Sequence, residues 1–368
     1  MDLPLVAGSR AQKGVRHCVE TTRGRQRPGC QDGVCDSLPR SFCLWGLGLP
    51  VNLLSVVTAA DDRYAHQACV LARSLALSQV AEVELTVLGT GWSASQIGLI
   101  RAAGGAAVKS RIVDPADGRV DSVRTLKHGF PAASIYSVIA PQNSLFDEAD
   151  RIIYLDADTL VRGDLRDLLS VSMTHPVAAV ADAHVALMGM PSMWRAWREE
   201  NVDPTAPYLN TGVMVIDVRK WRDRELTDAV LRMLTRYELP CVDQDALNLV
   251  LAGDFDRLAP RWNLMPYHLM RLLRTCDLIE TDESLENAIT DPAIVHYHRS
   301  FLGKPWQVGC THPARHLWRE LARDVGHRRP SLSVRDVARN AGARVVGMSV
   351  LDPRCEALRQ VRLRGSVM

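Results

Sequence analysis

The chain has 368 residues, of which 47% are hydrophobic and 23% charged, so it is long enough to bury a large core and is not disordered throughout. The formal net charge of only +2 gives no electrostatic basis for binding nucleic acid. The nine cysteines lack the paired C-x-x-C spacing of a zinc site, which favours reduced thiols in a cytoplasmic protein.

The first 50 residues differ from the rest of the chain. They contain four cysteines among many Gly and Arg residues and show no helical or strand periodicity. We interpret residues 1–50 as an extension outside the core and expect it to be disordered. The apolar stretch 42–60 is interrupted by Pro50 and Asn52 and followed directly by two aspartates, which disfavours a membrane span. A buried strand over 52–60 that ends in an acidic loop is the better interpretation.

After this strand the chain alternates between helix and strand patterns. Residues 64–77 have helical spacing, 83–90 a strand pattern, 93–107 helical spacing, and 151–161 the apolar run of another buried strand. This alternation predicts an α/β domain with a mostly parallel sheet and helices on both faces. Ligands of such sheets bind beyond the carboxyl ends of the strands, where Asp61 and Asp156 are expected.

The stretch RIIYLDADTL (151–160) places two carboxylates at the end of an apolar run. Residues i and i+2 of a strand face the same side, so Asp156 and Asp158 converge if the strand continues and flank a turn if it ends. Paired carboxylates with open positions around them suit Mn²⁺ or Mg²⁺ bridging a diphosphate. In the alternative, Asp156 caps a helix that begins near Thr159, and Asp158 is solvated.

Three later stretches add polar groups. An Asn-Thr-Gly corner before a buried run places Asn210 where it can hydrogen-bond a ligand. Asp243 and Gln244 stand at the start of a predicted helix, and the alternative for Asp243 is the N-cap of that helix. A strand is predicted to end at His296, and Lys304 follows before a Pro-Trp pair. A lone histidine is more often structural, but His296 at a strand end is also a candidate third metal ligand.

Five ordered stretches carry a family resemblance: TAADDRYAHQACVLARSL, RIIYLDADTLVRGDL, LNTGVMVIDVRKW, DQDALN and HYHRSFLGKPW. Over about residues 51–306 the chain resembles the family 8 glycosyltransferases, and most strongly their bacterial lipopolysaccharide galactosyl- and glucosyltransferases. The resemblance implies a GT-A fold with a Rossmann-like, mixed but mostly parallel sheet. It also implies retaining transfer of a hexose, glucose or galactose, from a UDP-sugar to a saccharide or lipid-linked acceptor, with Mn²⁺ bound through a DxD motif.

The resemblance also implies roles for individual residues. The implied donor-binding residues are Ala59, Asp61, Arg63, Asp156, Ala157, Asp158 and Lys304, and the implied metal ligands are Asp156, Asp158 and His296. The residues expected around the reacting sugar are Asp182, Asn210, Asp243 and Gln244. Because the amide of Gln244 is neutral and a poor nucleophile, we assign it to stabilising an oxocarbenium-like transition state. Whether a covalent intermediate forms stays open.

The chain departs from the family pattern in three places. The arginine that usually follows the tyrosine in the helix before the DxD strand is absent after Tyr136, and Arg124 or Lys127 are candidate substitutes. Arg63 stands where the bacterial enzymes often have asparagine. The loop from the candidate metal-ligand histidine to the phosphate-contacting lysine is two residues longer than usual.

Two other functions fit part of the pattern. The pair Asp156 and Asp158 also resembles the nucleophile motif of haloacid-dehalogenase-type phosphatases, although Leu160 stands where that motif has threonine. A catalytically degenerate domain that binds a sugar nucleotide without turnover is supported by the missing arginine.

We predict three regions: the N-terminal extension 1–50, a GT-A domain 51–308 and a basic C-terminal region 309–368. Within the domain, the Met- and Trp-containing segment 183–207 is a candidate acceptor platform, with core or lid packing as the alternative. Residues 315–368 carry twelve arginines against five acids, partly at helical spacings. We expect a cytoplasmic protein with peripheral contact to the inner face of the cytoplasmic membrane through this region, and the alternative is a solvated helical tail.

Overall fold

The structure is a computed structural model that describes residues 53–115, 117–120, 123, 132–190, 196–269, 283–300, 302–327 and 361. Its backbone contacts divide the chain into Met1–Pro50 and Val51–Met368, and every described residue belongs to the second unit. The three predicted regions stay a prediction. Arg124 and Lys127, the candidate substitutes for the family arginine, lie outside the described residues.

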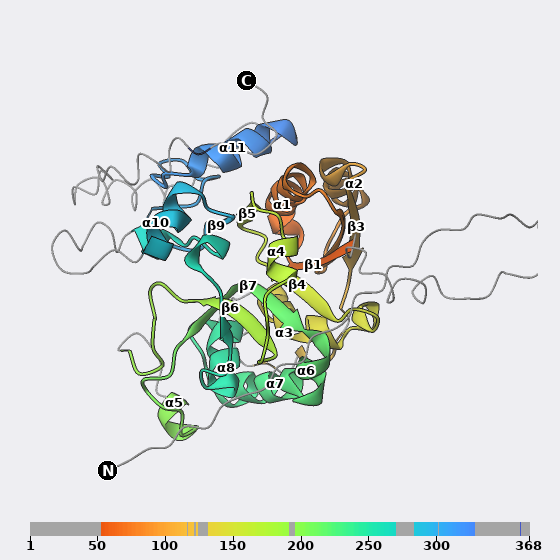
Figure 1. The fold of residues 1–368 in the computed structure, drawn as a ribbon. Helices are drawn as coiled ribbons and strands as arrows, with labels where there is room; N and C mark the ends of the chain where they lie inside the picture. Colours follow the sequence, from red (N-terminus) through yellow and green to blue (C-terminus); the bar gives the residue numbers. More distant parts are fainter. Residues whose placement is uncertain are drawn as a thin grey trace, which may run out of the picture. The chain divides into compact units, whose positions relative to one another are not determined.

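The second unit is built around a seven-stranded mixed sheet (Figure 1). Its strands are β1 (Leu53–Ala59), β2 (Glu82–Leu88), β3 (Val108–Val113), β4 (Arg151–Leu155), β6 (Val177–Ala181), β7 (Leu209–Asp217) and β8 (Asp256–Arg257). They lie in the order β3-β2-β1-β4-β7-β6-β8, and β7 alone among these seven runs opposite to the others. A second sheet pairs β5 (Thr159–Val161) with β9 (Ile294–His296).

Helices follow the strands, as the alternating pattern predicts. The longer ones are α1 (Ala65–Ser78), α2 (Ala94–Gly104), α7 (Leu226–Arg236), α8 (Val242–Leu251), α10 (Glu283–Thr290) and α11 (Arg315–Asp324). The shorter ones are α3 (Tyr136–Ile139), α4 (Arg166–Leu169), α5 (Ala196–Glu199) and α6 (Val218–Asp223). Single 3₁₀ turns are η1 (Asp62–Tyr64), η4 (Ala132–Ile135), η5 (Ala140–Gln142), η6 (Ser144–Phe146) and η7 (Pro260–Trp262).

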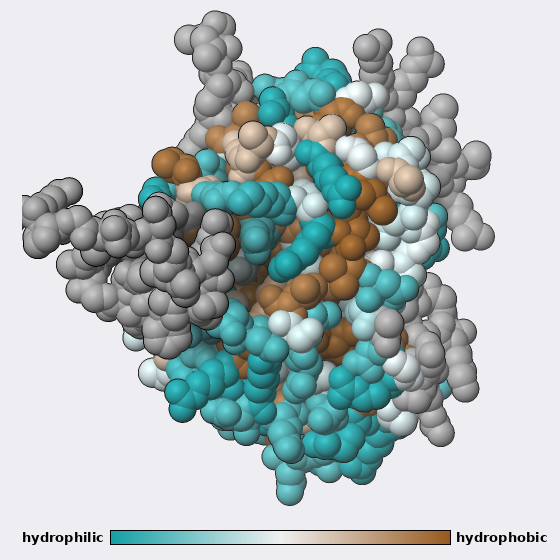
Figure 2. Space-filling view, turned by 90° about the vertical axis from the view of Figure 1, so that its right-hand side faces the viewer, coloured by the Kyte–Doolittle hydropathy of each residue, from teal (hydrophilic) through white to brown (hydrophobic). Residues whose placement is uncertain are grey.

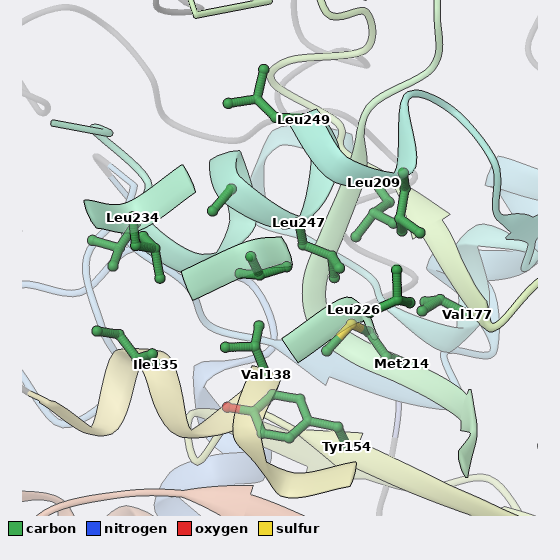
Figure 3. Packing of buried hydrophobic residues seen from close by; sticks show 14 of the residues in the cluster. Ile135, Val138, Tyr154, Val177, Leu209, Met214, Leu226, Leu234, Leu247 and Leu249 are labelled. Atoms are coloured by element: carbon green, nitrogen blue, oxygen red, sulfur yellow. The ribbon is translucent and has the colours of Figure 1, made fainter. Parts of the chain in front are cut away.

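Buried side chains of the central strands β4, β6 and β7 alternate between two cores, because successive residues of a strand point to opposite faces. On one face, Tyr154 and Met214 of the sheet belong to one buried cluster with Val138 of α3, Leu234 of α7 and Leu247 of α8, which Figure 3 labels. On the other face, residues such as Ile153 pack against α1 and α2. Helices therefore cover both faces of the sheet, and the predicted α/β class is confirmed.

The apolar run at 151–161 is two strands and not the single strand predicted. β4 ends at Leu155, and the chain turns through Asp156–Asp158 before β5 leaves the main sheet to pair with β9. The backbone N–H of Thr159 donates to the carbonyl oxygen of Asp156 at 3.0 Å, which closes this turn. Because residues 159–161 form a strand, the alternative in which Asp156 caps a helix is wrong.

The C-terminal helix α11 packs against α1 as part of the folded core. Its Leu317, Trp318 and Leu321 are buried in a cluster that also contains Val70 of α1 and the distant Val361. The alternative of a solvated helical tail is therefore wrong for α11. Among the described residues, no helix is both long and apolar enough to cross a membrane.

Strand β3 forms one edge of the main sheet, on the side that Figure 2 shows. Its Lys109 and Arg111 form ion pairs with Glu82 and Glu84 of β2. Hydrophilic and hydrophobic residues are interleaved over the upper part of this side, and hydrophilic ones dominate the lower part (Figure 2). Charged side chains along an edge strand disfavour pairing with a strand of another chain.

Candidate active site

A pocket of about 520 Å³ lies at the carboxyl ends of β1 and β4. Because these parallel neighbours end at the same edge of the sheet, the acidic loop after β1 and the turn after β4 meet there. Six predicted site residues line it: Ala59, Asp61, Asp156, Ala157, Asp158 and Asp243. The lining also includes Tyr64, Tyr154, Thr211 and Arg299, which the sequence analysis did not select.

Three predicted metal ligands converge beside this pocket. Pairing of β5 with β9 places Thr159 opposite His296, so the imidazole lies next to the turn that carries both aspartates. Nε2 of His296 is 3.1 Å from Oδ1 of Asp158 and 3.4 Å from Oδ2 of Asp156. One ligand atom from each residue lies within 4.8 Å of the other two. Two carboxylates and an imidazole can therefore reach one ion.

The surroundings of this triad fit a bound divalent cation. Nε2 of His296 is buried and has no hydrogen-bond partner among the described residues, although the Asp156 and Asp158 carboxylates lie within 3.4 Å of it. A Cβ atom at Gly212 of β7 would lie 2.1 Å from Cε1 of His296 and 2.9 Å from Oδ2 of Asp156, so only glycine fits there. Carboxylate oxygens are ligands that both Mn²⁺ and Mg²⁺ prefer, and the imidazole nitrogen is a softer ligand that favours the transition metal Mn²⁺ over Mg²⁺.

Charge in the triad is balanced by two cationic side chains. Burial alone lowers the pKa of His296, but the carboxylates of Asp158 and Asp156 outweigh it and raise that pKa to about 9. Burial raises the pKa of Asp158, but Lys304, whose Nζ contacts Oδ2, and His296 outweigh it and hold the pKa well below its usual range. A metal ion bound here must displace the proton on His296.

Two tyrosines complete the wall around the aspartates. The hydroxyl of Tyr154 donates to Oδ1 of Asp156 at 3.0 Å and orients that carboxylate. Burial, together with the charges of Asp158 and Asp156, raises the pKa of Tyr64 to about 12, so its hydroxyl remains a donor at neutral pH. The signal for Tyr154 was present in the sequence, because residues i and i+2 of a strand share a face.

The predicted sugar-binding residues form one hydrogen-bonded group. Nδ2 of Asn210 on β7 donates to Oδ2 of Asp182, which follows β6, and to Oε1 of Gln244 on α8, both at 2.9 Å. The backbone N–H of Thr211 also donates to Oε1 of Gln244, at 3.2 Å. Since Thr211 lines the pocket, this group lies directly beside it.

Asp243 is not the N-cap of α8, because Cys241 occupies that position and Asp243 lies in the first turn. Its Oδ2 accepts a hydrogen bond from the Ser137 hydroxyl at 2.9 Å. Ser137 directly follows Tyr136 and occupies the position where the family arginine is expected. Burial, and next the nearby Asp156 carboxylate, raise the pKa of Asp243 to about 7.

Of two exposed arginines near the pocket, Arg63 and Arg299, the second lines the pocket and the first does not. Arg63 was predicted to contact the donor, but its Nε donates to Oδ2 of Asp61 at 3.0 Å and its side chain, 70% exposed, does not line the pocket. Arg299 was not predicted, yet it lines the pocket from the loop between His296 and Lys304. The one feature of the sequence that could have drawn attention to Arg299 is the additional length of the loop that carries it.

Part of the candidate acceptor segment 183–207 is buried in the hydrophobic core. Val185, Met188 and Val202 are buried in the cluster under α7 and α8, so the packing alternative holds for them. His184 is exposed and stacks on Tyr267 with ring centroids 4.2 Å apart. Its backbone N–H donates to Oδ1 of Asp182, a member of the predicted sugar-binding group, at 2.7 Å. Trp194 lies outside the described residues.

Comparison with solved structures identifies the fold. The galactosyltransferase LgtC, in complex with donor and acceptor sugar analogs, superposes with a TM-score of 0.59 at 22% identity, covering 78% of this chain and all of that chain. The bifunctional glycosyltransferase WbbM superposes with a TM-score of 0.62 at 21% identity, covering 76% of this chain and 52% of that one. The predicted GT-A fold is thus confirmed.

Sequence comparison identifies the family. General stress protein A of Bacillus subtilis (strain 168) is 30% identical over 297 residues, 72% of this chain and 91% of that protein. A lipopolysaccharide 1,2-glucosyltransferase of Escherichia coli (strain K12) is 30% identical over 169 residues, 45% of this chain and 46% of that protein. The family model described as glycosyl transferase family 8 matches residues 55–309. The chain therefore belongs to glycosyl transferase family 8 and is a glycosyltransferase.

Proposed function

We propose that the chain transfers a hexose, glucose or galactose, from a UDP-sugar to a saccharide or lipid-linked acceptor with retention of configuration. The observation that carries the proposal is the convergence of Asp156, Asp158 and His296 beside the pocket. We propose Mn²⁺ as the bound ion, with Mg²⁺ as the alternative. The names of similar proteins support a glycosyl donor of this kind, since they include a glucosyltransferase and a galactosyltransferase.

The charge of the pocket supports a role for a bound cation. Four carboxylates, those of Asp61, Asp156, Asp158 and Asp243, line it, and a diphosphate is repelled by them unless positive charge intervenes. Lys304 contacts Asp158, and Arg299 adds a second cation at the pocket. We expect Ala59, the last residue of β1, and Asp61, in the loop after it, to contact the nucleoside.

The proposed reaction breaks the bond between the anomeric carbon and the β-phosphate oxygen, and UDP leaves with both electrons. An acceptor hydroxyl forms the new bond to that carbon, and its proton passes to a β-phosphate oxygen of the departing UDP. When bound, the divalent cation neutralises the charge that develops on the UDP leaving group. The Lys304 ammonium stabilises the same charge. Front-face attack and a covalent intermediate both fit this arrangement.

On the sugar side, neutral and anionic oxygens face the developing positive charge. In this proposal Asp182 holds hydroxyl groups of the donor sugar and Gln244 stabilises the oxocarbenium-like ring. Asn210 orients both of them, because its Nδ2 donates to the Asp182 carboxylate and to the Gln244 amide oxygen. Asp243, with its pKa near neutral, is placed to accept or donate a hydrogen bond there. These roles rest on the hydrogen-bonded group described above.

The test is UDP release by the purified chain from UDP-glucose and UDP-galactose, with and without Mn²⁺. We expect release that requires Mn²⁺ and falls by about 100-fold or more in Asp158→Asn, because the leaving-group charge is then uncompensated. The matched control is Asp254→Asn, a surface aspartate paired with Arg224, which should leave release unchanged.

Each alternative gives a different result in this assay. Full activity in excess chelator contradicts the metal assignment. Tight UDP-sugar binding without release supports the degenerate domain, which the absent arginine after Tyr136 favours. Family membership removes the phosphatase alternative, which predicts phosphate release in place of UDP.

A further inference from the structure

We propose that Asn263 is a positioning residue that fixes the ring and the tautomer of His296, so that the Nε2 lone pair faces Asp156 and Asp158. The inference rests on the metal site of the proposed function and assigns a residue that binds no ligand itself. Asn263 follows η7 and is fully buried. Its amide lies between Asn210 and His296, and each contact can be assigned from a fixed starting point.

That starting point is a backbone group. The N–H of Gly212 lies 3.1 Å from one amide atom of Asn210, and because a backbone N–H only donates, this atom must be the oxygen Oδ1. The amide nitrogen of Asn210 then faces Oδ2 of Asp182 and Oε1 of Gln244, both acceptors. The orientation of Asn210 is therefore determined by its surroundings.

The orientation of Asn210 in turn determines which amide atom of Asn263 is the oxygen. Oδ1 of Asn210 lies 2.8 Å from one amide atom of Asn263, which must be the donor Nδ2. The other amide atom, Oδ1, consequently faces Nδ1 of His296 at 3.0 Å. An amide oxygen only accepts, so Nδ1 of His296 carries a hydrogen.

This assignment decides the chemistry of His296. With a proton fixed on Nδ1, a neutral imidazole has its lone pair on Nε2, the buried atom that faces the two carboxylates and has no hydrogen-bond partner within the described part of the chain. The opposite tautomer would direct an N–H at the metal position and could not ligate. A second residue that holds the far nitrogen of a ligating histidine typically raises metal affinity by about 10–100-fold.

The backbone holds Asn263 in register with His296. The N–H of Leu264 donates to the carbonyl oxygen of Ile294 at 2.9 Å, and the N–H of His296 donates to that of Leu264 at 3.0 Å. On the opposite side the ring is limited by Gly212, where a Cβ atom would lie 2.6 Å from Nδ1. The imidazole is thus held between β7 and the segment of Asn263, and one hydrogen-bond chain connects it to the sugar-binding group.

The test is a titration of the full chain with Mn²⁺ alone, in which free Mn²⁺ is measured by electron paramagnetic resonance. Four proteins form a double-mutant cycle: wild type, Asn263→Ala, His296→Ala and the double variant. We expect Asn263→Ala to raise the Kd for Mn²⁺ by about 10–100-fold and to have no further effect once His296 is removed. Asn287→Ala on the exposed face of α10 is the matched control and should bind as wild type.

The cycle separates this inference from the metal site on which it rests. If wild type binds no Mn²⁺, or if His296→Ala binds as tightly as wild type, the metal site itself fails. If His296→Ala weakens binding but Asn263→Ala does not, only the inference fails. An equal loss from Asn263→Ala with and without His296 also overturns it, since Asn263 would then act through general structure.

A second variant covers the case in which the alanine protein does not fold. Asn263→Asp keeps an oxygen acceptor for Nδ1 of His296 but loses the N–H donated to Asn210. We expect this variant to retain Mn²⁺ affinity near that of wild type while its kcat for UDP release falls, because only the connection to the sugar-binding group is broken. Binding as weak as that of His296→Ala would overturn the proposal.

Discussion

At Gly212 the backbone of β7 approaches the proposed metal ligands more closely than any side chain permits. An added Cβ would lie 2.1 Å from Cε1 of His296, and because both β7 and the imidazole are buried, neither can shift without displacing packed neighbours. We expect Gly212→Ala to displace the imidazole, abolish Mn²⁺ binding and destabilise the fold by about 1–3 kcal/mol. Mn²⁺ titration and urea unfolding measure both effects.

The matched control for this substitution is Gly98→Ala on α2. In the part of the chain that the structure describes, no atom lies within 4 Å of a Cβ at Gly98. Alanine there should stabilise the helix by about 0.5–1 kcal/mol and leave Mn²⁺ binding unchanged. Normal Mn²⁺ affinity in Gly212→Ala would show that the close approach does not constrain His296.

Asp243 gives the stability of the protein a pH dependence whose sign can be worked out. Its pKa is about 7 in the folded protein, against about 3.9 for an unfolded aspartate. Between these values the folded state binds the additional proton, so the contribution of Asp243 to the free energy of unfolding decreases as pH rises from about 4 to about 7. The cause is burial of the carboxylate, reinforced by the charge of Asp156.

We therefore expect Asp243→Asn to gain stability relative to wild type as pH rises. Asparagine still accepts the Ser137 hydrogen bond but carries no charge. Urea unfolding in chelator at pH 5 and pH 8 measures the difference, and the variant should exceed wild type by more at pH 8. Wild-type and variant stabilities that run parallel with pH would contradict the shifted pKa.

Individual site residues could be predicted from the sequence where they stand at or just after the end of a predicted strand. Asp61, Asp156 and His296 each follow or end an apolar run, and the structure brings them to one side of the fold. Asn263 carried no such signal, because it follows a 3₁₀ turn and acts through a hydrogen bond to a residue 33 positions away. Sequence spacing cannot show a contact of that kind.

At the scale of elements, the short pairing of β5 with β9 builds the proposed metal site. Sequence periodicity could not separate β4 from β5, because buried residues continue through Leu160 and Val161 after the turn. Only the tertiary pairing, with Thr159 opposite His296, shows that the chain has changed sheets. The sequence predicted the α/β class well because the hydrophobic residues of its helices and strands recur with a clear period. Which strands pair with one another depends on contacts between residues far apart in the sequence, and local periodicity does not show these contacts.

Helix α11 supports the loop that carries Lys304. Its Trp318 packs on Trp306 with ring centroids 5.3 Å apart, and Nζ of Lys304 lies 5.3 Å from the Trp306 ring. Nε of Arg319 on the same helix donates to the carbonyl oxygen of Pro305 at 2.9 Å. The position of the lysine therefore depends on a helix from the basic C-terminal region.

We expect Trp318→Ala to lower the free energy of unfolding by about 3–5 kcal/mol, since it empties a fully buried site. It should also raise KM for the UDP-sugar, because Trp306 and Lys304 lose their support. Arg323→Ala, on the exposed side of α11, is the control and should change stability by less than about 0.5 kcal/mol. An unchanged KM in a folded Trp318→Ala protein would separate α11 from the Lys304 loop.

At the scale of the whole molecule, every described element lies after residue 52, and the family match begins at residue 55. We expect deletion of residues 1–48 to leave the melting temperature and UDP release nearly unchanged, as predicted from the missing periodicity of that segment. A deletion through Ala60 is the contrast and should prevent folding, because β1 lies between β2 and β4 in the sheet. A large loss of melting temperature in the shorter deletion would place the extension in the core.

The excess of arginine in the C-terminal region predicts salt-sensitive binding to anionic membranes. Because α11 and Val361 belong to the core, cutting the chain near residue 312 would damage the fold, so the test must change charge without removing residues. Three substitutions, Arg335→Gln, Arg339→Gln and Arg344→Gln, remove three charges, each of which contributes about 1 kcal/mol near an anionic leaflet. We expect the affinity for phosphatidylserine liposomes, measured by sedimentation, to fall by about 100-fold, and the binding that remains to decline as salt rises.

The matched control removes three exposed arginines outside this region, Arg219, Arg232 and Arg257, and should bind as wild type. Equal losses in both triple variants would mean that net charge, and not the C-terminal region, directs binding, and undiminished binding in the first would exclude these arginines as the membrane contact.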